Sequence, residues 1–315
     1  MKTVSVIVVT YNSANLLTQC VESLRSSECI SEVIIWDNDS KDSPALIVTK
    51  LVEAGNYSFD ITLHECDANI GFAKAVNSAA DLTSGDYLLL LNPDCLIDGG
   101  GVDKLVHQLQ IDSSIGVIAP SITHPSGRLR VKSAGFEPTA SNMLSQALGL
   151  PQFSSLSKGF NLYSKGETGT STEVDWVSGA CLLMRADRWR QLEGLSERWF
   201  MYAEDIELCR RLRAEGLRVV HYGGVHSSHL VGASSEGEAG PAWSLWLENL
   251  YDYYLVNLNR GFFDKQLWKC AMMFTFLSRA LGYRLKALAA GPSSVNWAQE
   301  SSKFLDYARA TTKLP

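Results

Sequence analysis

The sequence predicts an α/β protein with a mainly parallel central sheet flanked by helices, followed by a C-terminal helical appendage. Over the first 120 residues, short apolar runs alternate with segments of helical periodicity, and polar clusters follow the runs. After about Pro241 the composition shifts to aromatic and aliphatic helical segments. The chain has 315 residues, 46% of them hydrophobic and 20% charged, which suffices for a large core and excludes whole-chain disorder.

Four apolar runs in the first part of the chain have the length of buried strands. They are Val4–Val9, Glu32–Trp36, Ile61–Cys66 and Tyr87–Leu91. Each is followed by hydrogen-bonding side chains, in clusters that begin at Thr10, Asp37, Asp67 and Asn92. Ligands of open parallel sheets bind beyond the carboxyl ends of the strands, so these clusters are expected to converge on one crevice. No cluster contains a dinucleotide fingerprint or a P-loop, so phosphates must be bound in another way.

The pattern weakens after Pro120, and the stretch Ser154–Thr172 is expected to be a mobile loop. A further apolar stretch follows at Val174–Met184. Good helix formers at Glu204–Glu215 stop before Gly216, and a strand is expected directly afterwards, over Leu217–His221.

We expect a catalytic domain over residues 1–240 and a helical region over residues 241–315. The catalytic domain would divide into a nucleotide-binding half, residues 1–120, and an acceptor and catalytic half, residues 121–240. Helices are expected in the last region over residues 243–259, 262–290 and about 296–312.

The charge of the chain is acidic, with 28 basic and 34 acidic side chains and a net charge of −6, which does not favour a nucleic-acid binder. Residues 260–290 differ, with six basic residues against the single acid Asp264. This helix, which carries Leu267, Trp268 and Phe274 among its apolar residues, is suited either to an anionic lipid interface or to packing on the catalytic domain.

The seven cysteines are scattered and form no CxxC pair, which fits a reducing cytoplasm. No apolar run is long enough for a confident transmembrane helix. The sequence therefore predicts a cytoplasmic protein, at most peripheral on the inner face of the cell membrane.

Two strand-end clusters carry acids with a chemical interpretation. Asp94 follows a strand predicted to be buried on both faces, where a free carboxylate is costly, and a divalent cation bridging it to a diphosphate would remove that cost. The alternative is an ordinary turn. Asp37 and Asp39 can accept hydrogen bonds from a base or a ribose hydroxyl, with helix capping by Asp39 or Ser40 as the alternative.

Helical geometry separates the acids of the Glu204–Glu215 segment. Positions 205, 208, 209 and 212 have the spacing of a buried stripe, so Asp205 begins the inward face. Glu207 and Arg211, four residues apart, can pair in solvent. The alternative is that Glu204 and Asp205 only favour the helix N-terminus through its dipole.

An ordered set of motifs supports a family resemblance. They are Val6–Asn12, Trp36–Ser40, Asn69–Ala73 with Asn77, Asn92–Asp94, Ser178–Ala180 and Tyr202–Ile206. Over roughly residues 3 to 235 the chain resembles the family 2 glycosyltransferases with their GT-A fold. More narrowly it resembles the bacterial rhamnosyltransferase-like branch, which builds cell-surface polysaccharides.

The resemblance implies roles for particular residues. The nucleotide-sugar side would be lined by Thr10, Tyr11, Asn12, Asp37, Asp39, Asn69, Gly71, Asn77 and Asn92. Asn92 stands first where many relatives have a DxD triplet, which leaves Asp94 as the carboxylate for a Mg²⁺ or Mn²⁺ ion. His229 matches a histidine that often completes the metal site, with a surface histidine as the alternative.

The resemblance also implies the catalytic base and the contacts of the transferred sugar. Asp205 would take the proton of the acceptor hydroxyl. The sugar or acceptor would be contacted by Trp176, Ser178, Gly179, Ala180 and Glu204. A tight bend between strands is the alternative for the Ser-Gly-Ala segment.

The predicted function is that of an inverting, metal-dependent glycosyltransferase. The branch favours dTDP-L-rhamnose as donor, with UDP-hexose or UDP-N-acetylhexosamine as alternatives, and a glycan or polyprenyl-diphosphate-linked oligosaccharide as acceptor. The alternative functions are those of a sugar nucleotidyltransferase and of a non-catalytic glycan-binding protein. A nucleotidyltransferase would need a basic, glycine-rich loop near the N-terminus, and residues 10–13 contain neither glycine nor lysine.

Overall fold

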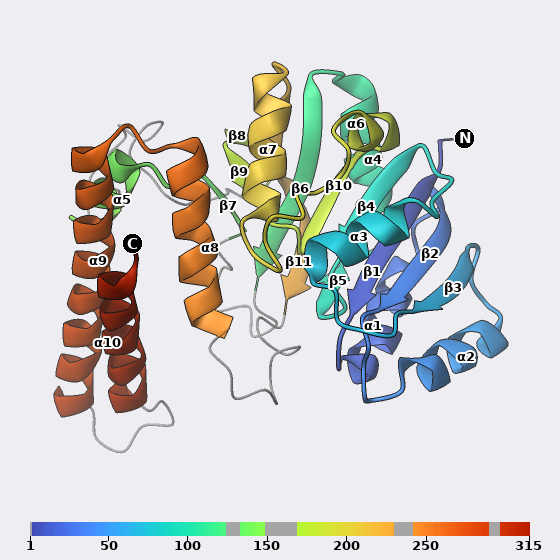
Figure 1. The fold of residues 1–315 in the computed structure, drawn as a ribbon. Coiled ribbons are helices and arrows are strands. Elements are labelled where there is room, and N and C mark those ends of the chain that lie inside the picture. Colours follow the sequence, from blue (N-terminus) through green and yellow to red (C-terminus); the bar gives the residue numbers. More distant parts are fainter. Residues whose placement is uncertain (1, 124–132, 149–168, 230–241, 290–296) are drawn as a thin grey trace. The chain divides into compact units, whose positions relative to one another are not determined.

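The computed structural model of the chain describes residues 2–123, 133–148, 169–229, 242–289 and 297–315. The chain forms two compact units: residues 1–135 with 163–238, and residues 136–162 with 239–315 (Figure 1). We refer to them as the sheet unit and the helical unit. The loop expected over Ser154–Thr172 falls mostly outside the described residues.

The sheet unit is built on a mixed sheet of nine strands among the described residues. Its order is β3 (Asp60–Glu65), β2 (Ile30–Asp37), β1 (Val4–Thr10), β4 (Tyr87–Leu91), β10 (Cys181–Arg185), β6 (Ile115–Thr123), β11 (Arg218–His229) and β5 (Cys95–Ile97), with β8 (Ser171–Val174) also paired to β11. The first four strands are mutually parallel. β10 and β5 run antiparallel to their neighbours, and β6 and β11 are parallel. The four strands predicted in the first part are confirmed, each within two residues.

The central strands are apolar on both sides because both faces of the sheet are covered. On β1, Val4, Val6 and Val8 belong to one core, and Ile7 belongs to the other. The helices α1 (Ala14–Leu24), α2 (Pro44–Ala54) and α4 (Gly101–Ile111) contribute to the first core. The second core receives residues of α3 (Phe72–Ala80), α6 (Ala186–Gln191) and α7 (Glu204–Ala214). The uninterrupted apolar runs are therefore the pattern of a doubly covered sheet.

The helix α7 follows the predicted spacing. Leu208, Cys209 and Leu212 are fully buried in the second core, so the inward face is confirmed. The helix ends at Ala214, and Gly216 has a φ of +79°, a left-handed conformation that glycine adopts without a steric cost. The following strand β11 is longer than predicted and continues to His229. A short separate pair is formed by β7 (Ala134–Gly135) and β9 (Trp176–Val177).

The helical unit consists of α5 (Ala140–Ala147), α8 (Ala242–Asn257), α9 (Phe262–Ala289) and α10 (Trp297–Lys313). The three C-terminal helices are confirmed within three residues at each end, whereas α5 was not anticipated. The Trp268 ring stacks on Tyr254 with ring centres 5.1 Å apart, and its indole N–H donates to Pro138 O at 2.7 Å. No helix in the described part of the chain combines the length and the apolar character needed to cross a bilayer.

Candidate active site

The strand-end clusters meet at the carboxyl edge of the parallel strands, as expected. Asn38, after β2, donates its backbone N–H to Thr10 O at 2.9 Å. Asn12, after β1, donates its N–H to Ser40 Oγ at 2.9 Å and accepts from Lys41 N at 2.8 Å. These bonds tie the first two loops into one surface at the edge of the sheet.

Asn38 joins the second and third clusters, a role that the sequence analysis missed. Its side chain donates from Nδ2 to Asn69 Oδ1 at 2.8 Å and accepts at Oδ1 from Ile70 N at 3.1 Å. Asn69 Oδ1 also accepts from Gly71 N at 3.1 Å. Asn38 is only 3% exposed, so its amide forms a buried link between the loops after β2 and β3.

The acids after β2 have different surroundings. Asp37 is buried and its Oδ1 accepts from Ser40 N at 3.1 Å. Helix α2 begins at Pro44 after Ser43, so the alternative of helix capping by Asp39 or Ser40 is wrong. Asp39 has a φ of +68° and pairs with the exposed Lys41 at 2.6 Å. Thr10 is fully buried, and its Oγ1 has no hydrogen-bond partner among the described residues.

Gly71 occupies a position that another residue would not fit. Its φ is +87°, and a Cβ atom built there would lie 2.6 Å from Phe200 O and 2.9 Å from the Phe200 ring. Phe72 N donates to the same Phe200 carbonyl at 2.8 Å. The start of α3 is therefore fixed against the segment that leads into α7.

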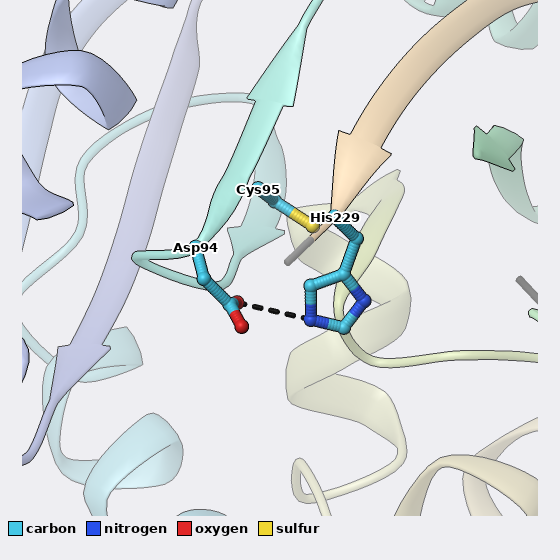
Figure 2. A group of neighbouring side chains, drawn as sticks. All are labelled: Asp94, Cys95 and His229. Carbon is cyan, nitrogen blue, oxygen red and sulfur yellow. Dashed lines mark ion pairs between the residues drawn. The ribbon is translucent and has the colours of Figure 1, made fainter. Parts of the chain in front are cut away.

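Asp94 and His229 form the candidate metal site (Figure 2). His229 at the end of β11 pairs in register with Cys95 at the start of β5, which brings the imidazole beside Asp94. His229 Nε2 lies 3.0 Å from Asp94 Oδ1. The side chains are only 12% and 2% exposed, respectively. Within the described chain neither Asp94 Oδ1 nor the other ring nitrogen of the histidine, His229 Nδ1, has a hydrogen-bond partner.

These donors fit a divalent cation. A carboxylate oxygen, an imidazole nitrogen and the Cys95 thiol all lie within 4.8 Å of one another. Oxygen and nitrogen ligands suit Mn²⁺ and Mg²⁺, whereas the thiol is a soft ligand that neither ion favours. A buried carboxylate without a hydrogen-bond donor is costly, and a cation would offset that cost. We therefore regard Asp94 and His229 as the candidate ligands.

Asp205 is the second residue of α7 and faces the loop between β9 and β10. Its Oδ2 accepts from Gly179 N at 3.0 Å, and its Oδ1 accepts from Ile206 N at 2.8 Å. The two residues before Glu204, Tyr202 and Ala203, both have left-handed backbones with φ of +73° and +76°. Such conformations are costly for non-glycine residues and concentrate at functional sites.

Glu204 and Asp205 share one buried environment but differ in their partners. Burial, and then the charge of Asp205, raise the pKa of Glu204 to about 8. Burial also raises the pKa of Asp205, although the N–H groups of Gly179 and Ile206 lower it in part. Glu204 Oε2 has no hydrogen-bond partner among the described residues. The two backbone N–H groups therefore favour the ionised form of Asp205, whereas burial without a partner favours the protonated form of Glu204.

Backbone hydrogen bonds connect the Asp94 and Asp205 regions. Asn92, two residues before Asp94, donates its N–H to Ala180 O at 2.9 Å. The neighbouring Gly179 N–H donates to Asp205. The candidate metal ligands and the candidate base therefore lie at the same edge of the sheet.

The chain is similar to known enzymes. The model for glycosyl transferase family 2 matches residues 5–166. The chain belongs to glycosyltransferase family 2. One relative of this family 2 glycosyltransferase is the N-acetylglucosaminyl-diphospho-decaprenol L-rhamnosyltransferase of Mycobacterium tuberculosis, 28% identical over 67% of this chain and 70% of the relative. Another is rhamnosyltransferase WbbL of Escherichia coli, 25% identical over 88% of this chain and 93% of the relative.

Solved structures show the fold of this family 2 glycosyltransferase. The mannosyltransferase PcManGT from Pyrobaculum calidifontis, in complex with GDP-Man and Mn²⁺, has a TM-score of 0.61 at 16% identity and covers 99% of this chain and 86% of its own. The structure of S. aureus TarS 1–349 has a TM-score of 0.50 at 15% identity and covers 99% of this chain and 90% of its own. The expected GT-A fold is confirmed.

Three of the residues expected to contact the sugar or acceptor in this family 2 glycosyltransferase precede or form the bend between β9 and β10. Ser178 Oγ accepts from Ala180 N at 3.2 Å, which is the tight bend of the alternative interpretation. Gly179 contributes its N–H to Asp205. Trp176 is 8% exposed and belongs to the second core. Their contact with a sugar stays a prediction, as do the nucleotide contacts expected of the residues after β1, β2 and β3.

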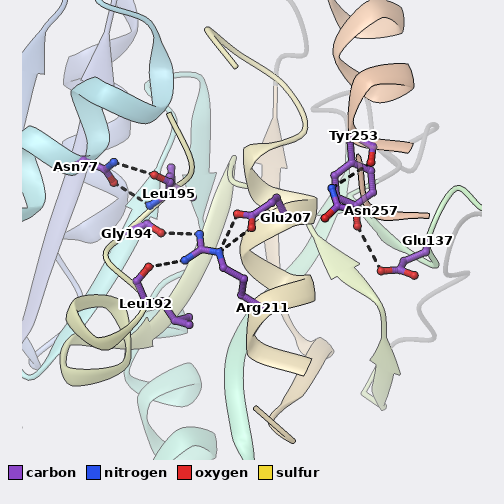
Figure 3. Close-up of polar contacts among 9 residues, drawn as sticks. All are labelled: Asn77, Glu137, Leu192, Gly194, Leu195, Glu207, Arg211, Tyr253 and Asn257. Carbon is purple, nitrogen blue, oxygen red and sulfur yellow. Dashed lines mark hydrogen bonds and ion pairs between the residues drawn. The ribbon is translucent and has the colours of Figure 1, made fainter. Parts of the chain in front are cut away.

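Asn77 holds the loop that precedes α7 in this glycosyltransferase (Figure 3). Its amide accepts from Leu195 N at 2.9 Å and donates to Leu195 O at 2.9 Å. From the other side, Arg211 donates to the carbonyls of Leu192 and Gly194 and pairs with Glu207 at 2.8 Å. The expected Glu207–Arg211 pair is present, but its side chains are only 16% and 29% exposed, so it is not the solvent pair that was predicted. The Arg211 guanidinium also fixes the loop.

Proposed function

We propose that this family 2 glycosyltransferase transfers L-rhamnose from dTDP-L-rhamnose, with inversion, to a hydroxyl of a cell-surface glycan or polyprenyl-diphosphate-linked oligosaccharide. The sugar and the lipid-linked acceptor are suggested by the names of the relatives from M. tuberculosis and E. coli. Such an acceptor would place the enzyme in the cytoplasm, at the inner face of the cell membrane.

The observation that carries this proposal is the different hydrogen bonding of the two carboxyl groups at the start of α7. Asp205 accepts two backbone N–H bonds, which favour its ionised form and fix its direction. An ionised, oriented carboxylate can take the proton of an attacking hydroxyl, and such a base contributes roughly 10²- to 10⁴-fold in rate. Burial favours the protonated form of Glu204, and in that form its carboxyl group can donate a hydrogen bond to a sugar or acceptor oxygen.

The leaving group of this reaction is a nucleoside diphosphate, which carries negative charge. Asp94 and His229 would hold a divalent cation, as argued above from their burial and their donor atoms. When bound, this ion neutralises the charge of the diphosphate. The loops after β1, β2 and β3, linked through Asn38, would bind the base and the ribose.

A thermal-shift panel of dTDP-, UDP- and GDP-sugars, with and without Mn²⁺, tests the donor and the metal. The expected result is the largest stabilisation with dTDP-L-rhamnose, increased by Mn²⁺, because only a ligand that binds the folded state raises the melting temperature. A selective shift with a UDP-sugar would show that the donor is a UDP-sugar and not dTDP-L-rhamnose, and the proposed glycosyl transfer would still stand. Equal shifts with all three nucleotides would exclude base recognition by this edge of the sheet.

Asp205→Asn tests the base. The variant is expected to lose roughly 10²- to 10⁴-fold in kcat and to keep the donor-dependent thermal shift. Asp60→Asn, at an exposed acid of β3, is the matched control and should retain turnover. Unchanged turnover in Asp205→Asn would refute the catalytic role and favour a non-catalytic glycan-binding protein.

A further inference from the structure

The helix α9 exposes a continuous apolar face. Its members follow one another in steps of three and four residues: Phe263, Leu267, Cys270, Phe274, Leu277, Leu281, Leu285 and Leu288. We call this set the apolar stripe. Because an α-helix has 3.6 residues per turn, this spacing aligns the side chains on one side. The stripe is open at both ends, since Phe263 is 86% exposed and Leu288 is 80% exposed.

The apolar stripe is large for a protein surface. The helix has 28 residues, which corresponds to a length of about 42 Å. The leucines and phenylalanines of the stripe are between 40% and 86% exposed. At roughly 150 to 200 Å² for a large apolar side chain, they leave roughly 600 to 800 Å² open. Patches on monomeric proteins rarely exceed about 300 to 600 Å², so a surface of this size indicates a binding face.

The opposite face of α9 is packed within the helical unit. Trp268, Met272 and Phe276 are buried, and the Phe276 ring lies 5.3 Å from the Tyr307 ring of α10. One side of this basic helix therefore packs within its own helical unit. On the other side the leucines and phenylalanines of the apolar stripe stay at least 40% exposed.

The charges of α9 determine which partner fits the stripe. The helix carries five cations, Lys265, Lys269, Arg279, Arg284 and Lys286, against one acid. That acid, Asp264, accepts hydrogen bonds from Tyr254 Oη at 2.7 Å and from Arg260 N at 3.1 Å. The helix thus has a net charge of +4 in a chain whose net charge is −6.

A second copy of the chain fits this pattern poorly. Pairing two stripes would place two helices of charge +4 side by side, and α9 has no acidic residues beside the stripe to form the interhelical ion pairs of a helix dimer. An anionic membrane surface would instead attract the cations of α9. The acyl chains below the headgroups also accept phenylalanine and leucine along the whole length of a helix that lies in the interface.

We infer that α9 lies along an anionic membrane surface, with the apolar stripe inserted at the boundary of headgroups and acyl chains. Lys269, Arg279 and Lys286 stand over the rings of Tyr251, Phe304 and Trp297, at 6.0, 5.5 and 5.1 Å from the ring centres. Because these cations also contact the packed side, insertion of the stripe supplies most of the affinity, and charge attraction adds to it. The inference rests on the proposed function in one respect: a lipid-linked acceptor would explain why the enzyme binds a membrane.

Flotation with vesicles tests the inference on the full chain. The wild-type protein is expected to float with vesicles of phosphatidylcholine and phosphatidylglycerol, and more weakly with phosphatidylcholine alone or at high salt. The triple variant Leu277→Gln, Leu281→Gln, Leu285→Gln is expected to lose roughly 10-fold in affinity per leucine. The double variant Leu46→Gln, Ile111→Gln, at positions 65% and 64% exposed outside the stripe, is the matched control and should float like wild type.

Two outcomes would overturn the inference. One is a triple variant that floats like wild type. The other is a wild-type protein that does not float but sediments as a dimer, which the triple variant dissociates; the stripe would then bind a second copy. Phe263→Ser, in the first turn of α9, repeats the test should the triple variant fail to fold. Turnover on a soluble acceptor is measured in parallel, so that a wild-type protein that is active but does not float refutes the membrane site and leaves the proposed function standing.

Discussion

His229 Nε2 lies 3.0 Å from Asp94 Oδ1, although the two residues are far apart in the sequence. The antiparallel pairing of β11 with β5 creates this contact, because it sets His229 opposite Cys95. Neither strand end would present a cation site alone. The pairing of the strands therefore determines which histidine can join the carboxylate.

His229→Ala is expected to weaken the Mn²⁺-dependent part of the thermal shift by at least about 10-fold in apparent metal affinity, because one of two candidate ligands is lost. Titration of Mn²⁺ in the presence of a nucleotide measures this effect. His107→Ala, at an exposed position of α4, serves as the control. An unchanged Mn²⁺ response in His229→Ala would exclude the histidine as a ligand.

The raised pKa of Glu204 predicts that the stability of the protein depends on pH. Its pKa is about 8 in the folded chain, against an ordinary value of 4.5. Between these values the folded state binds more protons than the unfolded state, so the free energy of unfolding falls as the pH rises. Glu204→Gln should flatten this part of the curve in urea unfolding, whereas Glu53→Gln, at an exposed glutamate, should not. A wild-type profile as flat as that of Glu204→Gln would contradict the assignment.

Asn38→Ala should separate the loops that follow β2 and β3. Removing the buried amide leaves Ile70 N and Asn69 Oδ1 without this partner, at a cost of about 1 to 3 kcal/mol in the free energy of unfolding. Nucleotide affinity should fall as well, because the linked loops form the expected nucleotide side. Chemical denaturation and nucleotide titration measure the two effects. Asn56→Ala, at an exposed asparagine, should change neither of them.

The same substitution at two glycines should have opposite effects. Gly71→Ala places a Cβ atom 2.6 Å from Phe200 O in a left-handed backbone, so it should destabilise the fold and impair activity. Gly282→Ala, inside α9 with no atom near the new methyl group, should stabilise the protein by about 0.5 to 1 kcal/mol. Thermal unfolding of both variants checks the pair. A Gly71→Ala variant as stable as wild type would show that the start of α3 can move.

Much of the fold was predictable because its signals are local. The run Tyr87–Leu91 is apolar throughout since β4 is covered on both faces, and Asp205 begins a spacing that belongs to one helix. Contacts between residues far apart in the sequence produce no local pattern of this kind. Asn38 is one polar residue among several in its cluster, and the grouping of α5 with the C-terminal helices arises from packing over a long sequence separation. The acids of the site could be assigned roles from the sequence, whereas the side-chain amide of Asn38, which links the loops, could not.

The position of Cys270 on the exposed side of α9 makes it a natural attachment point for a probe. Five of the other six cysteines are buried and Cys66 is partly covered. Burial raises the pKa of the Cys181 and Cys209 thiols to about 12, which suppresses the reactive thiolate. A maleimide dye added to the native, unmodified chain should therefore react first at Cys270. Its emission would then report directly whether the surroundings of this helix change from water to hydrocarbon.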